Sequence, residues 1–145
     1  HTTRGIINGS EKFGIRSCGT KQYRYIRNLH PDATFTNAVT REGGDNANFW
    51  TSWVSKAEAG DEHAKSMTEK YQHRPAEELY DVVADPHCLN NLIGSKDLQG
   101  VKVELSQQLD AWMASQGDQG DETEAIALTR KANAQNRRAT QRAEQ

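Results

Sequence analysis

The chain has 145 residues, enough for one domain, with 34% hydrophobic and 26% charged residues. This apolar fraction is low for a globular domain, so the composition predicts long polar tails, a domain that packs against a larger neighbour, or both. The formal net charge of −2 gives no general attraction to nucleic acid or anionic membranes. The apolar runs are too short for a transmembrane helix, and two cysteines do not make a disulfide framework.

The first part of the chain predicts β structure. Residues 1–8 are rich in Thr and Ile, which favours a strand. Polar and apolar side chains alternate over residues 13–18 and 22–29, on either side of a Gly-Thr-Lys turn at 19–21. This period of two around a glycine-bearing turn predicts a β-hairpin.

Two helices are expected after an irregular segment at residues 30–45, which holds a proline and two glycines. Asn46 can cap the first helix, which ends at Gly60 and carries one apolar stripe. The stripe consists of Phe49, Trp50, Trp53 and Val54. Asp61 begins the second helix, which extends to Lys70, and Pro75 excludes helix beyond Arg74.

A short strand is predicted at residues 78–83, with alternate residues on opposite sides. The pair Asp85-Pro86 ends it, because proline cannot donate to the strand ladder. The Asp85 carboxylate is expected to accept backbone N–H groups in the turn, and so is the side chain of Asn90 or Asn91.

The longest helix is predicted from Lys96 or Asp97 to about Gln116. Its apolar face consists of Val101, Leu105, Leu109, Trp112 and Met113. Residues 121–145 are polar and rich in Ala and Arg, and predict a flexible tail after a domain that covers residues 1–120. The element order predicts an α+β fold: a small antiparallel sheet of about four strands, a long helix packed on it and two further short helices.

The stretch from Arg74 to Leu92, which reads RPAEELYDVVADPHCLNNL, resembles a signature near the C-terminus of the formylglycine-dependent sulfatases. The predicted hairpin at 15–29 and the helix around 105–113 resemble two further segments of that family, in the same order. Residues 28–31 and the approach to the signature at 71–79 are most similar to the heparan N-sulfatase (sulfamidase) branch.

The resemblance implies a small sheet with a long helix, docked on a large α/β domain. In the family that large domain carries a Cys-x-Pro-x-Arg motif, whose cysteine becomes formylglycine, and the Asp and Asn ligands of a calcium ion. In this chain Gly-Thr-Lys follows Cys18 and Leu-Asn-Asn follows Cys88, so neither cysteine matches. We therefore expect no catalytic residue, metal ligand or cofactor in this chain, and no activity of the chain alone.

Substrate binding is expected at His1 and Arg4, because their segment resembles the crossing from the large domain to the small one beside the pocket mouth. An arginine there can hold an anionic sugar by charge-assisted hydrogen bonds; the alternative is a solvated chain end. Lys21, Arg24 and Arg27 are candidates for a basic face toward a glycan, although Arg24 and Arg27 have opposite strand parity.

Other polar and aromatic residues have structural alternatives. Asp81 and Asp85 suggest acid–base chemistry, but turn formation explains Asp85 equally well. Three histidines at 63, 73 and 87 lack metal-ligand spacing. Trp50 and Trp53 can stack on sugars, or can belong to a core, a domain interface or a self-association surface. The basic segment at 130–142 lacks the interleaved aromatics of a nucleic-acid binder.

The sequence thus predicts the C-terminal subdomain, or a fragment, of a sulfatase that acts on sulfated carbohydrate. Its expected partners are the catalytic domain or a self-association partner, together with a sulfated carbohydrate, and neither nucleic acid nor a membrane. The alternative is a stand-alone binding or assembly module. The resemblance implies a periplasmic, secreted or lysosomal location, which the residues themselves do not specify.

Overall fold

The computed structural model describes residues 13–37, 39–40 and 48–126. Within these residues the fold is α+β, as predicted, with a three-stranded antiparallel sheet and a long helix packed on it. The expected additional strand at 1–8 and residues 127–145 of the tail predicted at 121–145 lie outside the described residues, whereas residues 121–126 are described and are helical. Both therefore stay predictions, as does the domain boundary after residue 120.

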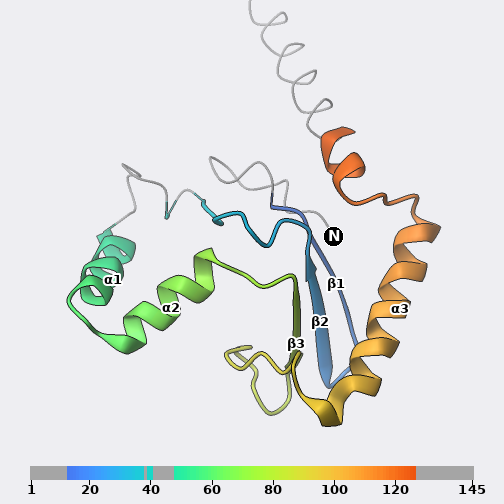
Figure 1. The fold of residues 1–145 in the computed structure, drawn as a ribbon, viewed down its shortest axis with the longest axis horizontal. Coiled ribbons are helices and arrows are strands. Elements are labelled where there is room, and N and C mark those ends of the chain that lie inside the picture. Colours follow the sequence, from blue (N-terminus) through green and yellow to red (C-terminus); the bar gives the residue numbers. More distant parts are fainter. Residues whose placement is uncertain (1–12, 38, 41–47, 127–145) are drawn as a thin grey trace, which may run out of the picture.

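The sheet has the spatial order β1-β2-β3, and both neighbouring strand pairs are antiparallel (Figure 1). The strands are β1 Ile15–Gly19, β2 Tyr23–Asn28 and β3 Glu77–Asp81. The turn between β1 and β2 is tight, because the backbone N–H of Thr20 donates to the carbonyl oxygen of Tyr23 at 2.8 Å. A Cβ on Gly19 would lie 2.7 Å from that same oxygen. Glycine is therefore required at this position, and the predicted hairpin is confirmed.

Strand β3 ends two residues earlier than the sequence predicted. The Asp81 carboxylate accepts the backbone N–H groups of Val83 and Ala84 at 3.0 and 2.9 Å. These local bonds compete with strand pairing and form a turn. The expectation that strand structure reaches Val83 is therefore wrong. The turn role of the next aspartate is confirmed, because the Asp85 carboxylate accepts the N–H of Asn90 at 2.7 Å.

Two helices follow β2, as predicted, and they pack against each other as a helical hairpin. They are α1 Asn48–Glu58 and α2 Glu62–Gln72. The Asp61 carboxylate caps α2 by accepting the backbone N–H of Ala64 at 2.9 Å. In Figure 1 this hairpin lies on one side of the sheet and the long helix lies on the other.

A row of aromatic rings connects the helical hairpin to the start of β1. The ring centroids of Phe13 and Phe35 are 4.9 Å apart, those of Phe35 and Tyr71 5.6 Å, and those of Tyr71 and Trp50 5.3 Å. Tilted and edge-on contacts at these distances are favourable. The row fixes the position of the hairpin, although Phe49 and Trp53 on α1 remain 60% and 39% exposed.

The main core lies between the sheet and the long helix α3 Gln99–Ser115, which follows a short 3₁₀ turn, η1 Lys96–Leu98. The fully buried members of this core are Tyr25, Leu79, Leu105 and Leu109. Leu105 and Leu109 belong to the predicted apolar face, which is confirmed for these two residues. Within the described part of the chain, no helix has the length and apolar character needed to cross a bilayer.

Trp112 does not belong to this core: its side chain is 47% exposed. Helix α3 presents Lys102 and Asp110 to the sheet as well as its leucines, and these two residues pair with Glu77 and Arg27. The buried face of α3 is therefore centred on Leu105 and Leu109, and Trp112 lies at the edge of that face. The expectation that Trp112 is buried is wrong.

Candidate functional site

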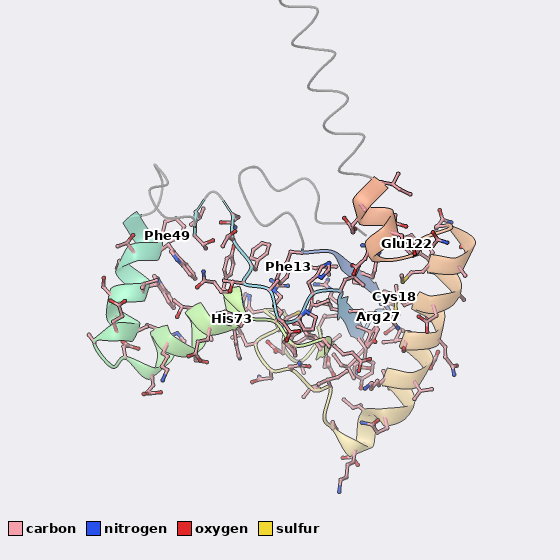
Figure 2. All side chains as sticks on the ribbon, turned by 45° about the horizontal axis from the view of Figure 1, so that its top comes forward. Phe13, Cys18, Arg27, Phe49, His73 and Glu122 are labelled. Carbon is pink, nitrogen blue, oxygen red and sulfur yellow. The ribbon has the colours of Figure 1, made fainter. Side chains whose placement is uncertain are left out.

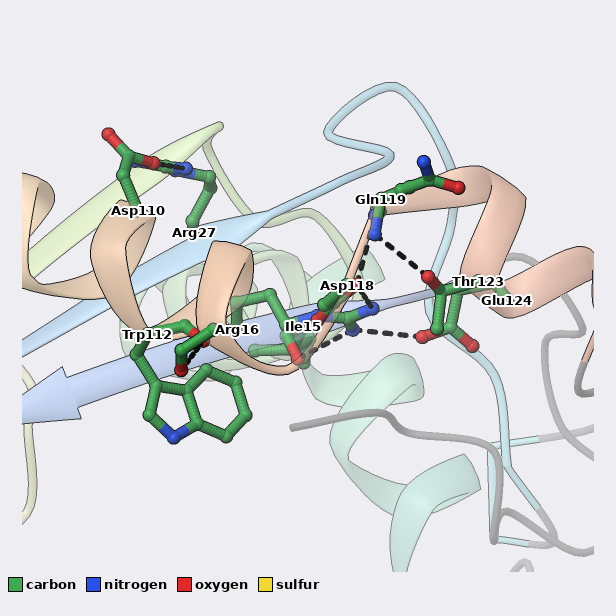
Figure 3. Close-up of polar contacts among 11 residues, drawn as sticks. Ile15, Arg16, Arg27, Asp110, Trp112, Asp118, Gln119, Thr123 and Glu124 are labelled. Atoms are coloured by element: carbon green, nitrogen blue, oxygen red, sulfur yellow. Dashed lines mark hydrogen bonds and ion pairs between the residues drawn. The ribbon is translucent and has the colours of Figure 1, made fainter.

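A buried ion-pair cluster joins β1 to the chain that follows α3 (Figure 3). Arg16 is 1% exposed, and its guanidinium binds both carboxylate oxygens of Asp118, with Nη2 to Oδ1 at 2.8 Å. Its Nη1 also donates to Glu124 Oε1 at 2.8 Å. Residues 121–126 are helical, so this bond connects that short helix to the sheet. The contact lies just beyond the predicted domain boundary.

The electrostatics of the cluster are those of a structural ion pair. The hydrogen bond from Arg16 lowers the pKa of Asp118 to about 2, although burial alone would raise it. The same bond raises the pKa of the Arg16 guanidinium. Arg16 and Asp118 are therefore held in their charged, bonded form at neutral pH. The sequence shows no sign of this cluster, because Arg16 lies 102 and 108 residues away from its two partners.

The cluster makes stability depend on pH in acid. The folded-state pKa of Asp118, about 2, lies below the ordinary value of about 3.9 for aspartate, so the unfolded chain binds more protons between these values. We expect the free energy of unfolding to fall as the pH decreases from about 4 toward 2. Urea denaturation at stepped pH measures this slope. The variant Asp118→Asn should lose this part of the slope, and an unchanged slope would contradict the assignment.

A cavity of about 520 Å³ opens on the sheet face opposite α3. The residues that line it come from β2, α2, the segment before β3, β3 itself and the loop after it. They are Arg24, Ile26, Met67, Lys70, Tyr71, His73, Arg74, Pro75, Glu78, Tyr80, His87, Cys88, Leu89 and Asn91. Figure 2 shows His73 where α2 meets the sheet, whereas Cys18 and Arg27 lie on the α3 side.

The floor of the cavity is a buried polar pair on β3. Tyr80 donates its hydroxyl to Glu78 Oε2, and Asn28 Nδ2 donates to Glu78 Oε1 at 2.7 Å. Burial raises the pKa of the Tyr80 hydroxyl strongly, and the bond to Glu78 adds to this. Tyr80 is therefore a neutral hydrogen-bond donor and not a base, and Glu78 is a satisfied acceptor.

The sequence-based candidates separate in the structure. His1 and Arg4 lie outside the described residues, so their role in substrate binding stays a prediction. The prediction that Lys21, Arg24 and Arg27 share one basic face is wrong. Arg24 lines the cavity, whereas Arg27 binds Asp110 at 2.6 Å on the α3 side of the sheet. The cause is strand parity, which places these two arginines on opposite faces.

The remaining histidines and cysteines show no catalytic arrangement in the described residues. His73 and His87 both line the cavity, whereas the His63 ring lies 5.9 Å from that of Trp53. Within residues 13–37, 39–40 and 48–126 no group of three or more His, Cys, Asp or Glu side chains is placed to hold a metal ion. Cys18 donates its thiol to the carbonyl oxygen of Leu105 at 3.1 Å, and burial raises the pKa of that thiol, which disfavours a nucleophilic thiolate.

Comparison with known proteins relates this chain to sulfatases. No family model matches the sequence. An ulvan-active sulfatase of Formosa agariphila is 32% identical over 117 residues, which cover 81% of this chain and 20% of that protein. A second ulvan-active sulfatase of the same organism is 27% identical over 123 residues, 84% of this chain and 20% of the relative. The chain thus spans about a fifth of the length of these relatives.

Proposed function

We propose that this chain is a subdomain of a sulfatase that acts on sulfated carbohydrate, where it packs on the catalytic domain and shapes the substrate pocket. The observation that carries the proposal is the sequence identity to two ulvan-active sulfatases over 81% and 84% of this chain. The α+β architecture supports it, because the resemblance seen in the sequence implied a small sheet with a long helix. The likeness to the heparan N-sulfatase branch remains a prediction.

The chemistry of sulfate removal would come from outside the described residues. In sulfatases a calcium ion neutralises the charge of the sulfate group, and a formylglycine supplies the nucleophile. Neither Cys18 nor Cys88 has the Pro and Arg neighbours of the modified cysteine, and the described residues offer no metal-binding cluster. Neither cysteine therefore fits formylglycine, and the described residues do not fit a calcium ion. The proposed role is to support and complete a pocket built by another domain.

The exposed face of α1 supports a role in packing. Phe49 is 60% exposed and Trp53 is 39% exposed on the same helix. Large exposed apolar side chains that lie close together commonly mark an interaction surface. In the proposed assembly the catalytic domain covers this face. The second candidate function, a self-associating module, uses the same face for a second copy of the chain.

A chimera tests the proposal. We expect the chain alone not to hydrolyse p-nitrophenyl sulfate. In the ulvan-active sulfatase, deletion of the matching 117 residues should abolish sulfate release from ulvan, and replacement by the corresponding segment of this chain should restore part of it. The deletion variant is the control, because it has the catalytic part without any replacement.

Two results would overturn the proposal. One is turnover of p-nitrophenyl sulfate by the chain alone, which would place the chemistry within it. The other is a deletion variant that keeps full activity, because the segment would then be dispensable. A chain that forms oligomers on size-exclusion chromatography, together with an inactive chimera, would favour the self-associating module.

A further inference from the structure

We propose that the cavity between α2, β2, β3 and the loop at residues 86–91 binds the oxyanion of a sulfated carbohydrate. All the residues that line the cavity in this structure belong to this chain. The choice of a sulfated carbohydrate as ligand rests on the proposed function, whereas the binding of an oxyanion rests on the lining of the cavity. The binding experiment below and the chimera above fail separately, because the first needs no catalytic domain.

The charge of the lining favours an anion. Arg24, Lys70 and Arg74 line the cavity against a single carboxylate, that of Glu78. Both oxygens of that carboxylate already accept hydrogen bonds from Asn28 and Tyr80. The chain as a whole carries a net charge of −2, so the cavity concentrates positive charge against the general balance. A concave site lined by one sign of charge attracts the opposite ion.

The cations keep donors available for a ligand. Arg24 is exposed and lies opposite Tyr80 in the strand register. Lys70 donates one hydrogen to the carbonyl oxygen of Leu89, and Arg74 stacks with its Cζ 5.7 Å from the centre of the Phe35 ring. Among the ion pairs that join described residues, none involves these three side chains. Guanidinium groups bind planar or tetrahedral oxyanions through paired N–H donors.

The apolar part of the lining fits the carbon skeleton of a sugar. Met67, Leu89 and the ring of Tyr71 form walls next to the cations. The Tyr71 hydroxyl accepts a hydrogen bond from Asn37 Nδ2 at 2.8 Å, which orients the ring. A volume of about 520 Å³ lies within the range of ~300–1,000 Å³ for small-molecule sites, which combine apolar walls with few polar groups.

The loop wall is held in place by the fold, so the cavity is present without a ligand. Asn91 Oδ1 accepts the backbone N–H of Leu79 in β3 at 2.9 Å, which fixes one end of the loop to the sheet. The bond from Lys70 to Leu89 fixes its middle to α2. Cys88 has a φ of 54°, a left-handed conformation that few residues other than glycine adopt. Such conformations persist where the surroundings determine them, often at binding sites.

Isothermal titration calorimetry of the full chain tests the proposal. The probe is a heparin-derived hexasaccharide, with unsulfated heparosan hexasaccharide and sodium sulfate as separate titrants. We expect heparin hexasaccharide to bind and the other two titrants to bind at least tenfold more weakly. Arg24→Gln should weaken binding about tenfold, the loss that corresponds to one charge-assisted hydrogen bond of ~1.4 kcal/mol.

Lys21→Gln is the matched control, because Lys21 is exposed in the neighbouring turn and does not line the cavity. It removes the same charge and should change the affinity less than about twofold, as expected for a distant exposed charge at ~0.15 M salt. Lys70→Gln, on a different element, should weaken binding as Arg24→Gln does. Amide chemical shifts of residues 87–91 report the site even if one variant folds poorly.

Several results would overturn the proposal. Equal losses for Arg24→Gln and Lys21→Gln would mean general electrostatic attraction. Equal affinity for sodium sulfate would mean a site for a free anion without carbohydrate. No binding, or shift changes on α3 but not at 87–91, would leave the cavity without this ligand and favour a protein segment as its occupant.

Discussion

Replacement of Arg16 by alanine is expected to lower the free energy of unfolding by about 3 kcal/mol. Arg16 is 1% exposed and serves two carboxylates, those of Asp118 and Glu124, whose side chains are each 10% exposed. Removal of the guanidinium takes these charge-assisted hydrogen bonds from two nearly buried carboxylates, and the loss of such bonds at a buried site is costly. Because the free energy of unfolding of a small domain is only ~5–15 kcal/mol, the expected loss is a large fraction of the total stability. Urea denaturation at pH 7, followed by circular dichroism, measures it.

Arg27→Ala is the matched control for this loss. Arg27 also lies on a strand and pairs with one carboxylate, that of Asp110, but the two side chains are 25% and 59% exposed. An exposed pair of this kind contributes ~0–1 kcal/mol. We therefore expect the loss for Arg16→Ala to be several times larger. Similar losses for the two variants would mean that water reaches the Arg16 cluster and that the short helix after α3 is not anchored by it.

The parts of the fold that the sequence predicted are those that depend on local patterns. The hairpin followed from alternation around a turn that only glycine fits at Gly19, and α2 followed from the cap at Asp61. The Arg16 cluster was missed because its partners are 102 and 108 residues away in the sequence. No period or motif connects positions so distant, and only the packing of the whole domain brings them together.

In the candidate site, too, the sequence predicted what depends on local pattern and missed what depends on long-range packing. Strand parity, which can be read from the sequence, is enough to place Arg24 and Arg27 on opposite faces of the sheet. The sequence does not show that Lys70 and Arg74 line the same cavity as Arg24, because this depends on how α2 returns to the sheet. The position of α2 depends in turn on the aromatic contacts of Phe35 and Tyr71, whose ring centroids are 5.6 Å apart. Contacts between a loop and a helix have no signature in sequence spacing.

Leu109→Ala is expected to lower the free energy of unfolding by about 3 kcal/mol, and Trp112→Ala by less than about 1 kcal/mol. Leu109 is fully buried between α3 and the sheet, so its truncation leaves a cavity in the main core. Trp112 is the larger side chain but is 47% exposed. Side-chain size ranks the tryptophan first, and the sequence pattern placed both residues on the apolar face. The structure ranks the leucine first. Thermal and urea denaturation of the two variants measure which substitution lowers stability more.

Val103→Ala serves as the control on the same helix, because Val103 is 51% exposed and its truncation opens no cavity. We expect it to behave like Trp112→Ala. A loss for Trp112→Ala as large as that for Leu109→Ala would mean that α3 is rotated about its axis in solution. That rotation would break the pairs of Lys102 with Glu77 and of Asp110 with Arg27. Lys102→Ala would then have no effect on stability, whereas the structure predicts a small loss.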